Sequence, residues 1–262
     1  MIRDIILLIC LGFLSSIGTA GQKTEIVIVG TVHSETPNYR IQDLVNILKR
    51  VKPDVILFEM PADMMTSSFE FKTILKDSPE QQAVMEYVRQ TGAKIRPYDI
   101  EGRNAFYQRS DFNSQDKRCN SELLDFAYKN KLNSKAQMIF ETIIAANNKS
   151  LKILKSDPEL INSFESDSAI NERYWLIHQG IPEIARLTPG LHSCAPFWDL
   201  SRAEWIHRNN RMVENIKKYS IEFAGQRLVV ICGYEHRYYL RSHLYDWRDE
   251  TPGYVIKEYW QY

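Results

Sequence analysis

The sequence predicts an α/β fold, with a mostly parallel central sheet that is flanked by helices and carries a helical insertion. Strand-like apolar runs alternate with helix-like segments in the first and last thirds of the chain, and such alternation is typical of parallel sheets. Two of these runs lead directly into the same short motif, Gly-x-x-His, at residues 30–33 and 233–236. The length of 262 residues, less a short N-terminal segment, fits a single domain over 21–262.

The first third of the chain reads as β-α-β-α-β. An apolar run at 25–30 predicts the first strand, and apolar residues at helical spacing predict a helix over 40–51. A continuous apolar run at 55–58 is typical of a strand that is buried on both faces. A helix over about 78–91 and a strand over 94–98 complete this half of the predicted sheet.

The middle of the chain, about 103–200, has mostly helical but irregular polar patterning, which indicates a helical insertion or cap. A capping-box pattern at 201–204 predicts the start of the next helix. Arg208 lies on the apolar stripe of that helix. Because an unpaired buried charge is strongly destabilising, we expect Arg208 to pair with an acid such as Glu59, or to bind an anionic group of a substrate.

The last third returns to the α/β pattern. A strand is predicted over 227–232, a helix from about 236 to 244 and a final strand over 254–257. Helices between these strands again favour parallel pairing, so both Gly-x-x-His motifs are expected at the carboxyl edge of one sheet.

Residues 1–20 have the features of a signal peptide. An apolar run at 5–14 has the length of a signal h-region, and Gly18, Thr19 and Ala20 are small residues suited to cleavage before Gly21. We therefore expect an exported protein, periplasmic or secreted, without stable membrane insertion after cleavage. An uncleaved N-terminal anchor is the alternative, although the run is short for a membrane span.

Composition narrows the function classes. The 33 basic and 33 acidic residues cancel, so nothing favours nucleic acid or an anionic membrane surface. Once the first 20 residues are removed, the cysteines are Cys119, Cys194 and Cys232. A single bridge between Cys119 and Cys194 is possible, and Cys232 ends an apolar strand as a core residue would. Without a Cys-x-x-Cys pair, a thiolate metal site is disfavoured.

The candidate site residues follow the predicted strands. His33 follows the first strand in a polar loop, where it could act as a general base or bind a metal. Glu59 ends the second strand, which we expect to lie next to the first, and Asp99 ends the third. His236 opens a helix, whose N-terminus lowers the pKa of a histidine and so favours the neutral ring that metal binding or base catalysis needs. The structural alternatives are a loop histidine bonded to the backbone for His33, a helix cap or an ion pair for the acids, and a water-bonded first-turn residue for His236.

Several well-known catalytic motifs do not occur in the sequence. It contains no His-Glu-x-x-His metalloprotease helix, no phosphate-binding P-loop, no Gly-x-Ser-x-Gly elbow and no Gly-x-Gly-x-x-Gly dinucleotide loop. A hydrolase in this chain would therefore activate water with the histidines and acids at the sheet edge, because no serine nucleophile has its usual setting.

The order of these motifs resembles the TraB/PrgY/GumN group. The matching features are Gly30–His33, Glu59, the segment 208–216 and Gly233–His236, each in its strand context, and the likeness covers roughly 24–101 and 200–245. That group is similar to the Wnt-inactivating TIKI metalloproteases, to erythromycin esterases and to ChaN-type haem-binding lipoproteins. The resemblance implies an α/β core with a helical insertion and a cleft that holds both histidines and the glutamate.

Three activities are implied by the resemblance. The TIKI-like branch implies divalent-metal-dependent hydrolysis of peptides, with Mn, Co or Zn held by His33, Glu59 and His236. The esterase branch implies metal-free hydrolysis with His33 as general base, but it usually has an acid where this chain has Thr31. The ChaN-type branch implies binding of haem through tyrosine or histidine. We expect an exported hydrolase of a peptide or small molecule, in which Arg208 orients Glu59 or stabilises an oxyanion; a haem- or ligand-binding protein is the alternative.

Overall fold

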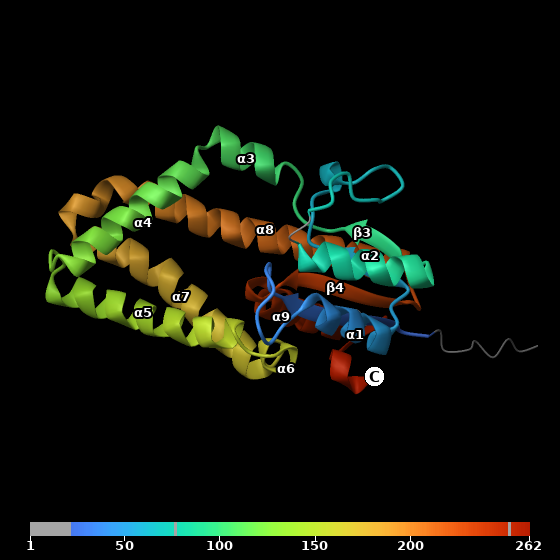
Figure 1. The fold of residues 1–262 in the computed structure, drawn as a ribbon. Coiled ribbons are helices and arrows are strands. Elements are labelled where there is room, and N and C mark those ends of the chain that lie inside the picture. The colour runs from blue at the N-terminus through green and yellow to red at the C-terminus, as the bar shows by residue number, and fades with distance from the viewer. Residues whose placement is uncertain (1–21, 76–77, 251–252) are drawn as a thin grey trace, which may run out of the picture.

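The computed structural model describes residues 22–75, 78–250 and 253–262, and it confirms the predicted α/β class (Figure 1). Its five strands are all parallel and lie in the order β3-β2-β4-β1-β5. Each predicted strand is present, with ends that differ by one residue at most: β1 Thr24–Thr31, β2 Val55–Phe58, β3 Lys94–Pro97, β4 Arg227–Gly233 and β5 Tyr254–Lys257.

Two helical layers cover the sheet. Residues that alternate along each strand point to opposite faces. In β1, Val27 and Val29 pack toward helices α1 (Ile41–Val51) and α2 (Pro79–Thr91). Ile26 and Ile28 pack instead toward α8 (Ala195–Glu222) and α9 (Tyr234–Glu250). The two faces together bury every residue of β2 and nearly all of β1 and β4, which is why these strands read as unbroken apolar runs.

Between β3 and β4 the described chain is helical and forms an arm (Figure 1). This helical arm consists of α3, α4, α5, α6, α7, the short 3₁₀ helix η2 and the first half of α8, and it extends away from the sheet. Its helices have these bounds: α3 Arg103–Arg109, α4 Phe112–Tyr128, α5 Ser134–Leu154, α6 Pro158–Ile161, α7 Phe164–Leu187 and η2 Pro189–Cys194. Two further 3₁₀ turns lie outside the arm, η1 at Ala62–Met64 and η3 at Tyr259–Gln261.

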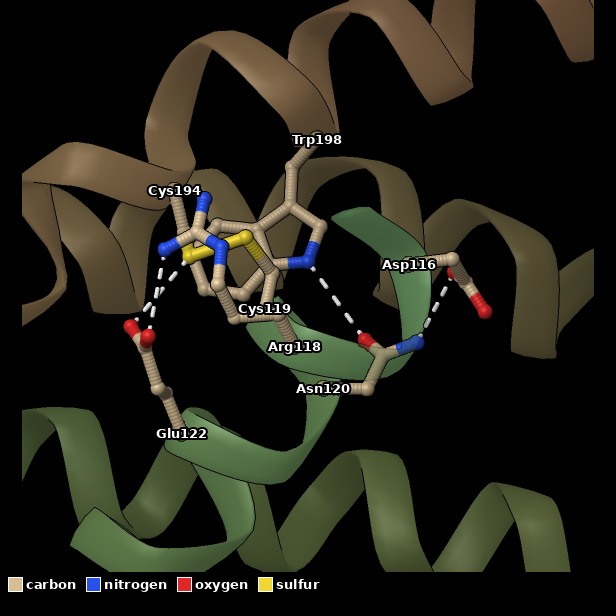
Figure 2. The surroundings of a disulfide bond; sticks show 7 residues. All are labelled: Asp116, Arg118, Cys119, Asn120, Glu122, Cys194 and Trp198. Atoms are coloured by element: carbon tan, nitrogen blue, oxygen red, sulfur yellow. Dashed lines mark hydrogen bonds and ion pairs between the residues drawn. A yellow bond between two sulfur atoms is a disulfide. The ribbon is translucent and has the colours of Figure 1, made fainter. Parts of the chain in front are cut away.

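The arm has its own hydrophobic core, which is closed by a disulfide. Cys119 of α4 bonds to Cys194 at the end of η2, 75 residues later, as the sequence allowed (Figure 2). Figure 2 also shows Trp198 beside the bridge, with its indole N–H donating to Asn120 at 3.5 Å. A bridge over a loop of this length stabilises a fold by on the order of 4 kcal/mol in the chain-entropy model. Cys232 is the free, buried cysteine that its strand position predicts.

Two predicted helices have the wrong boundaries. Helix α8 begins at Ala195, not at the capping-box pattern of 201–204, which lies inside the helix. The chain passes straight from η2 into α8 with Pro196 in the first turn, a position where proline's missing N–H costs nothing. Helix α9 begins at Tyr234, directly after β4, and runs on to Glu250. The predicted signal peptide lies outside the described residues, and within them no helix is long and apolar enough to span a membrane.

Candidate functional site

The two Gly-x-x-His motifs lie next to each other at the carboxyl edge of the sheet. Strands β1 and β4 are neighbours, and Thr31 is in register with Gly233. The chain leaves β1 toward one face of the sheet and leaves β4 toward the other. Such a reversal is the place where open parallel sheets bind ligands. One expectation is wrong: Glu59 does not follow a strand adjacent to β1, because β4 lies between β1 and β2.

His33 is the exposed member of the pair. Its side chain is 77% exposed, and its Nδ1 lies 3.2 Å from Oε1 of Glu80, a carboxylate that is only 8% exposed. Glu80 is in the first turn of α2 and also accepts hydrogen bonds from the hydroxyls of Thr31 and Ser78. The hydrogen bond to Glu80 raises the pKa of His33 above its usual value. Because the carboxylate accepts the Nδ1 proton, the lone pair of a neutral His33 is on Nε2.

Glu59 connects the second motif to the rest of the site. Its Oε2 accepts the backbone N–H of Gly233 at 2.7 Å, and its Oε1 accepts from Arg208 at 2.6 Å. Burial alone would raise the pKa of Glu59, but the side chains of His236 and Arg208 and the Gly233 N–H hold it below its usual value. Glu59 is therefore ionised at neutral pH.

Arg208 finds the acidic partners that its position on an apolar stripe requires. It donates to both oxygens of Asp99 at 2.9 Å, in addition to its bond with Glu59. Its third nitrogen lies 3.2 Å from Nε2 of His236. Asp99 also pairs with Arg103, so two arginines balance two buried carboxylates. The sequence placed Asp99 at this edge, and the structure shows it as the shared partner of both arginines.

His236 is the buried member of the pair. Its Nδ1 lies 2.8 Å from Oδ1 of Asn209, whose amide donates to the backbone of Trp205, so Nδ1 is the donor and Nε2 accepts from Arg208. The ring stacks on Trp205 at 4.5 Å, and Trp205 stacks on Tyr174 at 4.2 Å. Burial lowers the pKa of His236 to about 4. The sequence predicts this direction from the helix N-terminus, and in the structure burial is the largest cause.

The glycines of both motifs stand where backbones approach closely. A Cβ on Gly233 would lie 3.1 Å from Nε2 of His33 and 3.7 Å from Oε2 of Glu59. A Cβ on Gly30 would lie 3.2 Å from the backbone of Tyr234 at the start of α9. A side chain at 233 would therefore press on the His33 ring, and glycine leaves the space between His33 and Glu59 open.

A small cavity of about 180 Å³ lies beside His33. Its walls include His33, Glu59, Glu80, Arg103 and Gly233. Arg208 and His236 pack behind Glu59 and are not part of this wall. The site thus has two layers: a cavity with an oriented imidazole and a cation, and a buried ionic layer that holds the walls in place.

Of the three predicted metal ligands, the structure brings Glu59 and His236 together around Arg208. The guanidinium of Arg208 contacts both Oε1 of Glu59 and Nε2 of His236, so a fixed positive charge occupies the space that these donors share. It also takes the His236 lone pair that a metal would need. Across the described chain, no group of three or more His, Cys, Asp or Glu side chains is arranged to hold a metal ion.

Sequence reasoning missed three residues that complete the site: Glu80, Arg103 and Asn209. Glu80 follows Ser78-Pro79 at the start of a helix, a pattern that places a carboxylate near the helix N-terminus but does not say what it faces. Arg103 and Asn209 each adjoin a residue or loop that the sequence did single out. The partner of Asn209 is 27 residues away, so spacing alone does not reveal it. Arg103 is four residues from Asp99, but it precedes no predicted strand or motif that would have marked it.

Comparison of the chain with protein-family models, with curated proteins and with solved structures found no match in any of the three. The resemblance to the TraB/PrgY/GumN group therefore stays a prediction that rests on the motifs.

Proposed function

We propose that this chain is an exported hydrolase of the TraB/GumN type that cleaves an ester or amide bond with His33 as general base. The observation that carries the proposal is the pairing of His33 with the buried carboxylate of Glu80 at the sheet's topological switch point. A carboxylate that fixes one ring nitrogen leaves the other free to take a proton from water, as in other histidine-dependent hydrolases.

The reaction follows from the cavity walls. His33 Nε2 accepts a proton from a water molecule as the water oxygen bonds to the carbonyl carbon of the substrate. The carbonyl oxygen gains the negative charge, which the guanidinium of Arg103 in the same cavity is suited to stabilise. When the bond to the leaving group breaks, the protonated His33 returns its proton to the leaving oxygen or nitrogen. Atoms and charge balance without another reactant.

The buried layer positions these groups. Glu59 fixes the backbone of Gly233 beside His33, and Asp99 holds Arg103 at the cavity wall. Arg208 binds both acids, and it contacts His236, which Asn209 holds in turn. Because the whole layer is buried and fully hydrogen-bonded, it can keep Arg103 and His33 oriented before substrate binds, as electrostatic catalysis requires.

The proposed mechanism is metal-free, because Arg208 already places a positive charge between Glu59 and His236. A divalent cation between Glu59 and His236 would have to displace Arg208 or lie beside it, and repulsion between two such charges in a buried site is large. The two readings differ in an easily measured property, because only the metal-dependent one requires activity to be lost on chelation.

The test uses the secreted form of the protein and a panel of activated esters and amides. Wild type, His33→Gln and the matched control His207→Gln, an exposed histidine of α8, are assayed with EDTA and with added Mn, Co or Zn. We expect turnover that is insensitive to EDTA, lost in His33→Gln and kept in His207→Gln. Turnover that needs added metal would restore the metal-dependent mechanism, and equal turnover in wild type and His33→Gln would exclude His33 as the base.

A further inference from the structure

A second cavity, in the helical arm, adjoins the proposed site. It has a volume of about 240 Å³ and lies among α3, α4, α7 and α8. Most of its wall is aromatic or aliphatic: Tyr107, Phe112, Ile177, Ile181, Pro182 and Trp198. Arg208, the cation at the centre of the buried ionic layer, also lines this arm cavity.

A pair of arginines links the wall of the arm cavity to the wall of the cavity that contains His33, called here the His33 cavity. Arg103 lines the His33 cavity, Arg208 lines the arm cavity, and both donate to Asp99. Helix α3 spans the junction, since Arg103 and Tyr107 are four residues apart and so lie on one helix face. The two cavities share no lining residue, so a molecule that occupied both would have to pass over this arginine pair.

The chemistry of the arm cavity suits an uncharged ring. Burial lowers the pKa of His178 to about 4 and raises the pKa of the wall carboxylate Glu204, and both shifts favour the neutral form. Arg202 forms an ion pair with Asp199 at 3.2 Å. Arg208 is engaged by Glu59 and Asp99. Aromatic walls favour ring-shaped groups, which stack or pack edge to face against them. The cavity around His33, at about 180 Å³, has Phe58 as its one aromatic wall residue, so it offers less stacking surface for such a group.

We propose that the arm cavity is the specificity pocket of the site and binds a bulky apolar group, preferably an aromatic ring, on the acyl side of the substrate. The effect of this pocket on catalysis rests on the proposed hydrolase function, whereas the binding of a ring in the pocket does not. The substrate class is thus an ester or amide of an aryl-substituted carboxylic acid.

The kinetic test compares p-nitrophenyl 4-phenylbutyrate with p-nitrophenyl acetate. Burial of a phenyl ring should favour the phenyl ester in kcat/KM by roughly 30-fold or more. Ser201→Phe, which fills the cavity from α8, should remove this preference. Ala203→Phe is the matched control, because Ala203 is exposed on the same helix and lies outside the cavity wall. It should keep the preference. No preference in wild type, or a preference unchanged in Ser201→Phe, would overturn the proposal.

A binding measurement separates this proposal from the proposed reaction. We would titrate 3-phenylpropionamide and propionamide into the unreactive His33→Gln protein and follow tryptophan fluorescence, since Trp198 and Trp205 line the cavity. Binding of the phenyl compound alone, lost on adding Ser201→Phe, supports the pocket even if no ester is hydrolysed. Equal or absent binding of the two amides refutes the pocket even if esters are hydrolysed. Should Ser201→Phe fail to fold, the comparison of the two amides on the unmodified pocket still decides.

Discussion

The two Gly-x-x-His motifs are nearly identical in sequence context, yet their histidines lie in opposite environments. His33 is 77% exposed and bound to the carboxylate of Glu80, which raises its pKa. His236 is 5% exposed, stacked on Trp205 and bound to Arg208, with its pKa lowered to about 4. Of these two histidines, His33 is the one exposed to solvent, so under the proposed function the same motif supplies a base at one strand end and a structural anchor at the other.

The contrast shows that the partner of a histidine, more than the motif around it, decides what the ring can do. A carboxylate on one nitrogen orients the ring and stabilises its protonated form. A guanidinium on one nitrogen takes the lone pair and disfavours protonation. Equivalent substitutions at His33 and His236 should therefore have different effects on activity and on stability.

The largest effect is expected from replacing each histidine by glutamine. His33→Gln should lower kcat/KM by roughly 10²–10⁴-fold, the range for loss of a general base, and should leave the free energy of unfolding almost unchanged because the side chain is exposed. His236→Gln should chiefly destabilise the fold. Urea unfolding and ester hydrolysis on both variants measure this, and a large stability loss in His33→Gln would erase the distinction.

Removing the cation of the buried layer should cost almost as much. Arg208→Leu leaves Glu59 without its ion pair and Asp99 with only Arg103, and breaking such a buried pair costs roughly 3–5 kcal/mol of unfolding free energy. Arg211→Leu, one turn further along α8, breaks only an exposed pair and should cost less than about 1 kcal/mol. Similar losses in the two variants, measured by urea denaturation, would mean that the buried layer is not important for stability.

The lowered pKa of His236 predicts how stability depends on pH. As pH falls below about 6.5, the unfolded chain binds a proton at this histidine, whereas the folded chain does so only near pH 4. Stability present at pH 7 is therefore lost across this window, by about 3 kcal/mol for this group. The wild type should lose that much more stability than His236→Gln between pH 7 and pH 4, as measured by urea unfolding. Parallel curves for the two proteins would contradict the lowered pKa.

The smallest effect concerns Glu80. Because the bond to Glu80 raises the pKa of His33, the base becomes active only as pH rises through that raised value. Glu80→Gln removes the negative charge, so the rise in activity should move to lower pH, and the plateau should fall by roughly tenfold as the ring loses its orientation. Glu86→Gln on the same helix is the control, since its carboxylate pairs with Lys49 at the surface. A pH profile that does not move in Glu80→Gln would show that Glu80 acts only as a helix-capping residue.

The sequence by itself determined the strands, the two main helical layers and most of the candidate site. Runs such as 25–30 and 55–58 could be read because a strand buried on both faces needs apolar residues at every position. The sequence allowed a bridge between Cys119 and Cys194 because the strand position of Cys232 indicated a core residue, and the structure contains that bridge. Arg208 could be given an acidic partner because an isolated buried charge is too costly to keep.

Only the tertiary structure decided the strand order and the partners of each histidine. Sheet order depends on how helices pack on the two faces, and here it places β4 between β1 and β2, so that Glu59 reaches His33 across Gly233. Glu80 is 47 residues from His33 in the sequence, and Asn209 is 27 residues from His236. Contacts over such separations leave no periodic signal in a single sequence, because they depend on the packing of whole elements.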